Sequence, residues 1–180
     1  MAMNIDAGLW HPDAVAFLHQ AERSAMPLVH SGACDLASKA LKSRRATELF
    51  PGAKSPEAVL AGLLLRLNCW SEAHEVAQDI GSSEGGYWHA IVHRMEPDYG
   101  NASYWFRRVG KHPIFPELLN RAKALAAEFS QVKFAMPGEW KPELFSRLCE
   151  EATRKPGSDA ERLAVEIQQA EWELLMEWCA

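Results

Sequence analysis

His89 and His93 stand four residues apart in a segment whose composition favours a helix. Residues with this spacing lie on the same face of an α-helix, so both imidazoles could bind one metal ion. The segment is not the His-Glu-x-x-His motif of zinc proteases, because Ala90 occupies the position of the general-base glutamate. The pair therefore predicts a metal site that lacks this proteolytic signature.

Three further side chains could complete such a site. His74 lies on the preceding predicted hairpin, and His112 follows the next predicted helix. Glu96, three residues after His93, could bind the metal or orient an imidazole. Imidazole ligands favour transition metals such as zinc or nickel over magnesium or calcium.

Two alternatives stand beside the metal site. The apolar and aromatic residues around His89 are typical of a crowded helix interface, where histidines pack structurally and the protein needs no cofactor. This is the interpretation that the sequence favours. Metal-free acid–base catalysis is the other alternative, and no residue is assigned a catalytic role.

The composition predicts that helices position these side chains. The chain has 27 alanines and 19 leucines but only eight valines, five isoleucines and two threonines. Alanine and leucine favour helices, whereas β-branched residues favour strands. We therefore expect one all-α domain over residues 1–180, in which 81–86 form a loop and the alternation at 132–136 is compatible with a short strand. Helices are predicted near 13–25, 35–50, 55–67, 71–79, 87–95, 99–109, 116–129, 142–154 and 158–180.

The middle of the chain contains an internal repeat. Residues 56–80 align with 85–109 at a shift of 29 residues, and each unit predicts two helices joined by a tight turn. A small residue on each helix allows close approach, and an aromatic residue follows each turn. The aligned pairs are Ala61 with Ala90, Leu63 with Val92, Trp70 with Tyr99, and Ala73 with Ala102.

The stretch from Asp98 through Tyr99 and Ala102 to Trp105 and Phe106 resembles the second-helix motif of tetratricopeptide-type repeats. The resemblance covers roughly residues 56–110 and implies an array of helical hairpins, flanked here by additional helices, that binds a protein partner. It transfers no catalytic residue. The chain departs from the family pattern because the units are shorter than the usual ~34 residues and the Trp-x-x-Leu-Gly opening is absent.

The last predicted helix, 158–180, is acidic and has two apolar stripes. It carries six acidic residues and one basic residue, which equals the net charge of −5 of the whole chain. Two stripes predict either a helix inserted into the core, which we favour, or a surface for a second chain. The candidate partner-binding residues are Trp172, Leu175, Met176 and Trp178.

The overall charge and the cysteines exclude several protein classes. A mildly acidic chain is atypical of nucleic-acid binders, and no apolar run is long enough to span a membrane. The first residues lack a secretory signal, and there is no Cys-x-x-Cys pair. We therefore expect a cytoplasmic protein with four reduced cysteines.

Two functions remain as hypotheses from the sequence. The first is a non-catalytic helical-repeat scaffold that binds a protein partner or self-associates as a homodimer. The alternative is a histidine-centred transition-metal-binding protein that could also act as an enzyme. The two differ in where their residues lie, the first on the last helix and the second on the central hairpins.

Overall fold

The computed structural model describes residues 8, 10–21, 23, 25–31, 34–35, 38, 40–134 and 137–180, and within these ranges it is helical and has no strand. The prediction of an all-α fold is therefore confirmed. The elements are α1 (Pro12–Ala21), the 3₁₀ helix η2 (Leu41–Ser43), α3 (Ala46–Leu49), α4 (Pro56–Arg66), α5 (Trp70–Gln78), α6 (Ser83–Met95), α7 (Tyr99–Val109), α8 (Phe115–Glu128), α9 (Pro142–Thr153) and α10 (Asp159–Cys179).

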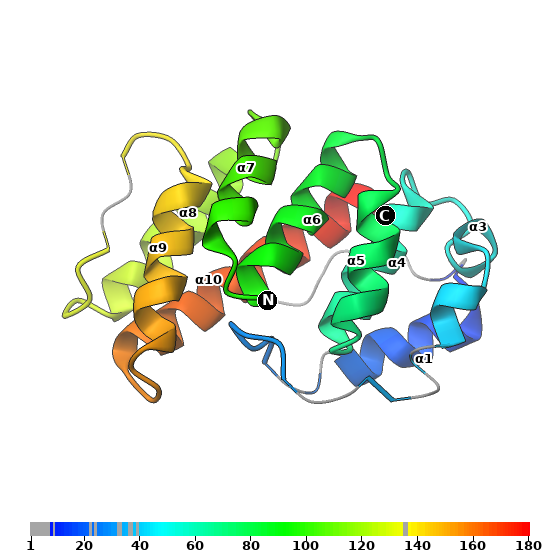
Figure 1. Ribbon diagram of the computed structural model, residues 1–180, viewed down its shortest axis with the longest axis horizontal. Helices are drawn as coiled ribbons and strands as arrows, with labels where there is room; N and C mark the ends of the chain where they lie inside the picture. The colour runs from blue at the N-terminus through cyan, green and yellow to red at the C-terminus, as the bar shows by residue number, and fades with distance from the viewer. Residues whose placement is uncertain are drawn as a thin grey trace.

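The central helices stand side by side in chain order, each packed against the next (Figure 1). The helices α4 and α5 form one hairpin and α6 and α7 form the next, as the repeat predicts. Ala61 and Ala90, at corresponding positions of the two units, are both buried, and so are Ala73 and Ala102. Small residues thus lie where the paired helices approach one another, an arrangement compatible with a helical repeat.

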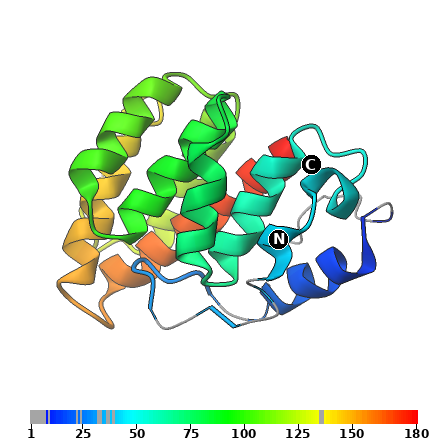
Figure 2. The same ribbon diagram turned by 45° about the vertical axis from the view of Figure 1, so that its right-hand side comes forward.

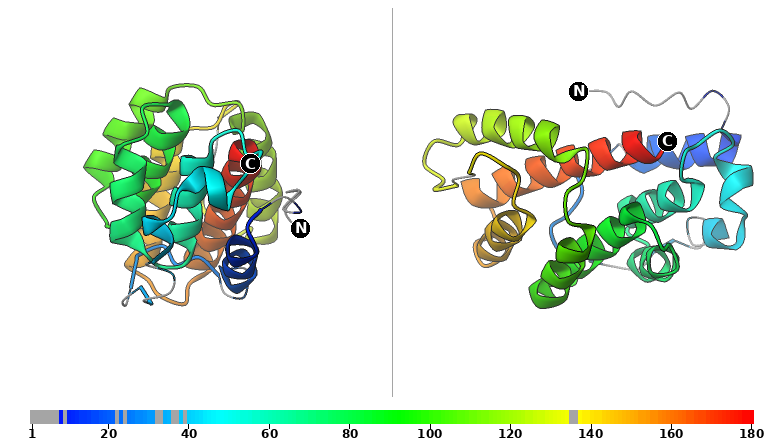
Figure 3. Two further views of the ribbon diagram at one scale, coloured as in Figure 1. Left: turned by 90° about the vertical axis from the view of Figure 1, so that its right-hand side faces the viewer. Right: turned by 90° about the horizontal axis from the view of Figure 1, so that it is seen from above.

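The long helix α10 runs behind this row and packs against α4, α8 and α9 (Figures 2 and 3). The Trp172 indole N–H donates a hydrogen bond of 2.8 Å to the Gly62 carbonyl of α4. A Cβ atom at Gly62 would lie 2.6 Å from Met176 Sδ and from the Trp88 ring, so glycine permits this close packing. The second apolar stripe of α10 therefore meets the chain's own core.

Local sequence signals mark the starts of two helices. Pro56 opens α4 in the first turn, and Ser55 precedes it at the N-cap position, where its side chain makes no capping hydrogen bond. Ser158 caps α10, where its hydroxyl oxygen accepts a hydrogen bond of 3.2 Å from the Glu161 backbone N–H. Local sequence signals thus set both helix starts.

The predicted loop over 81–86 is wrong from Ser83 onward, because α6 begins there. A Cβ atom on Gly85 would lie 2.4 Å from the Ile80 carbonyl oxygen. The glycine therefore serves close packing inside the first turn of a helix, rather than the flexibility that its sequence context indicates.

The helix predicted over 35–50 is not continuous, although Leu41–Ser43 and Ala46–Leu49 are helical. Among the described residues of this range, Arg44 and Arg45 are extended, and they separate η2 from the short α3. The Arg44 guanidinium bonds to the Asp13 carboxylate of α1 at 3.2 Å. The extended backbone at Arg44 thus coincides with a side-chain contact to α1. Residues 132–134 form no strand, and Met136 lies outside the described residues.

The prediction of four reduced cysteines is wrong as well. Cys34 and Cys69 form a disulfide whose Cα atoms are 4.6 Å apart, although 35 residues separate them in sequence. Cys149 and Cys179 are free and buried, and burial raises the pKa of each thiol to about 12. Among the described residues, no helix combines the length and apolar character that crossing a bilayer requires.

Candidate metal centre

The helices α5 and α6 are fixed against each other beside the candidate histidines. Trp70 begins α5, and its indole N–H donates a hydrogen bond of 2.9 Å to the Val92 carbonyl of α6. His74 follows one turn later on α5, while His89 and His93 lie one turn apart on α6. The bond between the two helices thus lies within one turn of the facing histidines.

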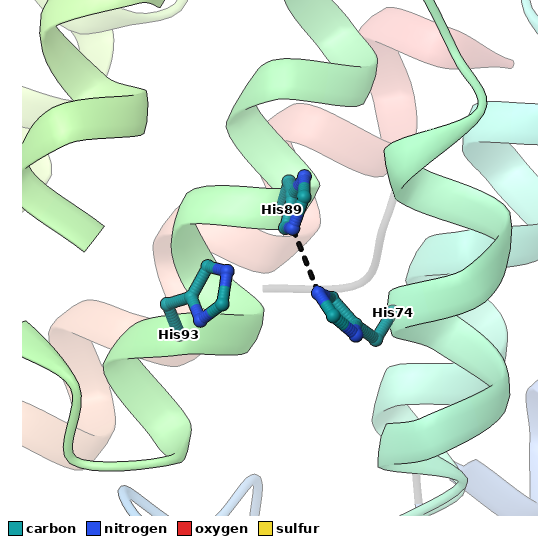
Figure 4. A group of neighbouring side chains, drawn as sticks. All are labelled: His74, His89 and His93. Carbon is teal, nitrogen blue, oxygen red and sulfur yellow. Dashed lines mark hydrogen bonds between the residues drawn. The ribbon is translucent and has the colours of Figure 1, made fainter. Parts of the chain in front are cut away.

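Three of the predicted ligands converge. His74, His89 and His93 each offer a ring nitrogen, and these atoms all lie within 4.8 Å of one another. The side chains point toward one another from the two helices, and the Nε2 atoms of His74 and His89 are 2.8 Å apart (Figure 4). Two nitrogens on one tetrahedral zinc ion are about 3.3 Å apart, given Zn–N bonds of ~2.0–2.1 Å. The Nε2 atoms of His74 and His89 therefore need to separate by only roughly half an ångström to bind the same ion.

Stacked aromatic rings hold these imidazoles in place. His30 stacks on Trp70 and Trp70 stacks on His74, with ring centroids 4.9 and 5.5 Å apart. Trp105 of α7 stacks on His89 at 4.1 Å. Rings held in this way have few alternative rotamers, so the ligand set is preorganised.

Burial keeps two of the imidazoles neutral. His89 is only 5% exposed, and burial, reinforced by His74 and His93, lowers its pKa to about 4. Burial and then His93 also lower the pKa of His74, whereas Glu96 opposes the shift. Metal binding requires unprotonated imidazole, so at neutral pH these two ligands give up no proton.

Glu96 lies beside the cluster rather than among its converging nitrogens. One carboxylate oxygen is 3.4 Å from Nδ1 of His93, a position suited to orienting the ring and leaving Nε2 for a metal. The Asn101 amide nitrogen is 3.1 Å from that Nε2 and would have to move when a metal binds there. Of the two roles that the sequence suggests for Glu96, metal ligand or residue that orients an imidazole, its position fits the second.

The structure does not bring His112 into this cluster. His112 contacts Tyr87, Phe115 and Trp178, with its ring centroid 5.1 Å from that of Tyr87. It is 3% exposed, and burial lowers its pKa to about 4. Its position after α7 directs it into a separate aromatic environment, which the sequence spacing alone did not reveal.

The candidate partner-binding residues of α10 face inward. Trp172, Leu175 and Met176 have no exposed surface. Trp178 is partly exposed, but its indole N–H donates a hydrogen bond of 2.9 Å to Glu84 and the Lys54 ammonium lies over its ring. These four side chains are therefore engaged with the rest of the chain.

Sequence reasoning missed the residues that surround the histidines. Trp70 and Trp105 stack on the cluster, Asn101 contacts His93, and His30 extends the stack from a distant segment. The spacing of Trp70 and His74, four residues apart on one helix, was an available signal for the first of these contacts.

Comparison with protein-family models, with curated proteins and with solved structures gave no match to this chain.

Proposed function

We propose that this protein binds a transition-metal ion, zinc first among them, through His74, His89 and His93. The observation that carries the proposal is the convergence of three ring nitrogens within 4.8 Å from two helices. Three nitrogen ligands leave a coordination position open for water or a small substrate. That ligand count is typical of catalytic rather than closed structural zinc sites.

The electrostatic surroundings support a divalent cation. The lowered pKa values of His74 and His89 keep these two imidazoles uncharged at neutral pH, and the carboxylate of Glu96 lies next to His93. A carboxylate beside the non-ligating nitrogen of an imidazole increases the basicity of that ligand. Glu96 therefore favours metal binding without itself being a ligand.

The test is metal binding by protein that carries no histidine tag. Elemental analysis and titration calorimetry with zinc and nickel should show about one equivalent bound. Saturation should also raise the free energy of unfolding, by about 2.7 kcal/mol at a free zinc concentration 100 times the Kd. Less than about a tenth of an equivalent, with no shift in the unfolding transition, would contradict the proposal.

Variants locate the site. His89→Ala should weaken zinc binding by at least ~100-fold, because loss of an outer-shell partner alone typically reduces affinity 10–100-fold. Glu96→Gln should weaken it by about tenfold. His19→Ala, which removes an exposed histidine of α1, serves as the control and should leave the affinity unchanged.

The alternative function is a helical scaffold that binds a protein partner or a second copy of the chain. The adjacent hairpins α4–α5 and α6–α7 and the resemblance to tetratricopeptide-type repeats support it. The apolar stripe of α10 no longer supports it, because Trp172, Leu175 and Met176 are buried and offer no docking surface. Light scattering and a pull-down test this hypothesis, and a monomer that retains no partner would count against it.

A further inference from the structure

A second group of potential ligands lies at the start of α5. The two sulfur atoms of Cys34 and Cys69 and a carboxylate oxygen of Glu72 all lie within 4.8 Å of one another. We propose that reduction of the Cys34–Cys69 disulfide converts this group into a redox-controlled zinc site, separate from the histidine cluster.

Helix geometry places two of these ligands together. Cys69 is the N-cap residue of α5 and Glu72 is in its first turn, three residues later, a spacing that puts both on one face of the helix. The Glu72 side chain belongs to a residue only 7% exposed, so its carboxylate lies largely out of water. A carboxylate oxygen at this distance from two sulfur atoms can act as the third ligand of a zinc ion.

Contacts other than the disulfide hold Cys34 near the other two ligands. The Ser31 backbone N–H donates a hydrogen bond of 3.3 Å to the Asn68 side chain, which donates in return to the Ser31 carbonyl. The His30 N–H donates to the Met95 carbonyl at 3.1 Å.

The start of the same segment is anchored to the core. Met26 and Leu28 are buried, and the Gln168 amide donates a hydrogen bond of 2.7 Å to the Pro27 carbonyl. These contacts do not depend on the sulfur–sulfur bond. The reduced cysteines therefore remain close together, and the chelating pair is formed before the metal arrives.

The redox chemistry decides when the site exists. A dithiol reductant supplies two electrons and two protons, which break the S–S bond and give two thiols, while the reductant becomes a disulfide. Zinc then binds the two sulfurs as thiolates and displaces one proton from each. Two thiolates and a carboxylate suit zinc, whereas the disulfide sulfurs carry no charge and bind it poorly.

The two sites differ in ligand chemistry, so each can be detected alone. Glu72 and His74 are two residues apart on α5 and therefore point in different directions around the helix axis. Only the reduced cysteine site contributes thiolate ligands. Cobalt(II), a common substitute for zinc, shows thiolate-to-metal charge-transfer absorbance in the near ultraviolet when sulfur binds it, and imidazole ligands do not produce this band.

The experiment titrates the full-length protein with cobalt(II) in its oxidised form and after reduction by a phosphine, which takes up oxygen from water and provides no thiol. The reduced protein should bind one more equivalent than the oxidised protein and show the thiolate band, and zinc should remove the band. Equal stoichiometry in both forms, or no band after reduction, would overturn the proposal.

Variants assign the ligands and separate this site from the first. Cys34→Ser should abolish the additional equivalent, and Glu72→Gln should weaken it at least tenfold; an unchanged affinity in Glu72→Gln would overturn the assignment of Glu72. Glu75→Gln, on the same helix and paired with Lys42, is the matched control and should bind like the wild type. His89→Ala should keep the thiolate band, so failure of the histidine site leaves this test intact.

Discussion

The two faces of α6 use polar side chains in opposite ways. The face toward α10 carries Tyr87 and Arg94, both fully buried, and the Arg94 guanidinium forms an ion pair with the buried Glu171 carboxylate. Tyr87 donates a hydrogen bond of 3.0 Å to the same carboxylate. The opposite face carries His89, whose Nε2 is 2.8 Å from Nε2 of His74, and His93, whose Nε2 is 3.1 Å from the Asn101 amide nitrogen.

This difference distinguishes a structural polar group from a candidate site. Arg94 and Glu171 balance each other's charge, and removal of either leaves an uncompensated charge inside the core. The Nε2 atoms of His74 and His89 are directed at one another, and among the described residues the buried atoms without a hydrogen-bond partner include Nδ1 of His89 as well as Nε and Nη1 of Arg94. The first face carries its own counter-charge, whereas the metal site proposed on the second would take its positive charge from a bound cation.

The largest expected effect comes from breaking the ion pair on the face of α6 toward α10. Arg94→Met should lower the free energy of unfolding by about 3–5 kcal/mol, because Glu171 stays buried without its partner. Urea unfolding followed by circular dichroism measures the loss. The double variant Arg94→Met/Glu171→Met should recover most of the stability. A loss below ~1 kcal/mol in the single variant would show that the pair is not held in the core.

An intermediate effect concerns His112, which packs against Tyr87 of the same face. Burial is the main cause that lowers its pKa to about 4; Glu84 opposes the shift and Lys54 adds to it. Between pH 6.5 and 4 the unfolded chain therefore takes up a proton that the folded chain does not. The free energy of unfolding should fall by up to about 3 kcal/mol as the pH drops through this window. Above pH ~6.5, where His112 is neutral in both states, this loss of stability is absent.

Urea titrations between pH 4 and 7 measure this dependence. His112→Gln removes the titrating group, so the difference between wild type and variant isolates its contribution from those of the other histidines. Parallel pH profiles for the two proteins would show that His112 titrates in the folded state as it does in the unfolded chain.

The smallest expected effect belongs to the histidine face without metal. His89→Leu should change the free energy of unfolding by about 1 kcal/mol or less, since leucine keeps apolar contact with Trp105 and the half-buried His74 can reach water. Denaturant unfolding in the presence of a chelator provides the measurement. A loss as large as that of Arg94→Met would place His89 among the structural residues, as the sequence favoured.

Much of this site could be predicted from short-range spacing. The separation of His89 and His93 puts both on one helix face, and the repeat brings α5 next to α6, which carries His74 to them. The position of His112 could not be predicted from spacing, because its ring packs against Phe115 and Trp178, which lie on two other helices. The helical position of Gly85 could not be predicted either, because its role is set by contact with the Ile80 backbone.

The sequence by itself determined the helical content, the cap at Ser158, and the faces on which side chains lie. These properties depend on interactions within about four residues. The tertiary structure alone decided which faces meet: His74 with His89 across 15 residues, Cys34 with Cys69 across 35, and Arg94 with Glu171 across 77. Such contacts arise from the burial of apolar surface by the whole chain, which is non-directional and leaves no local signal in the sequence.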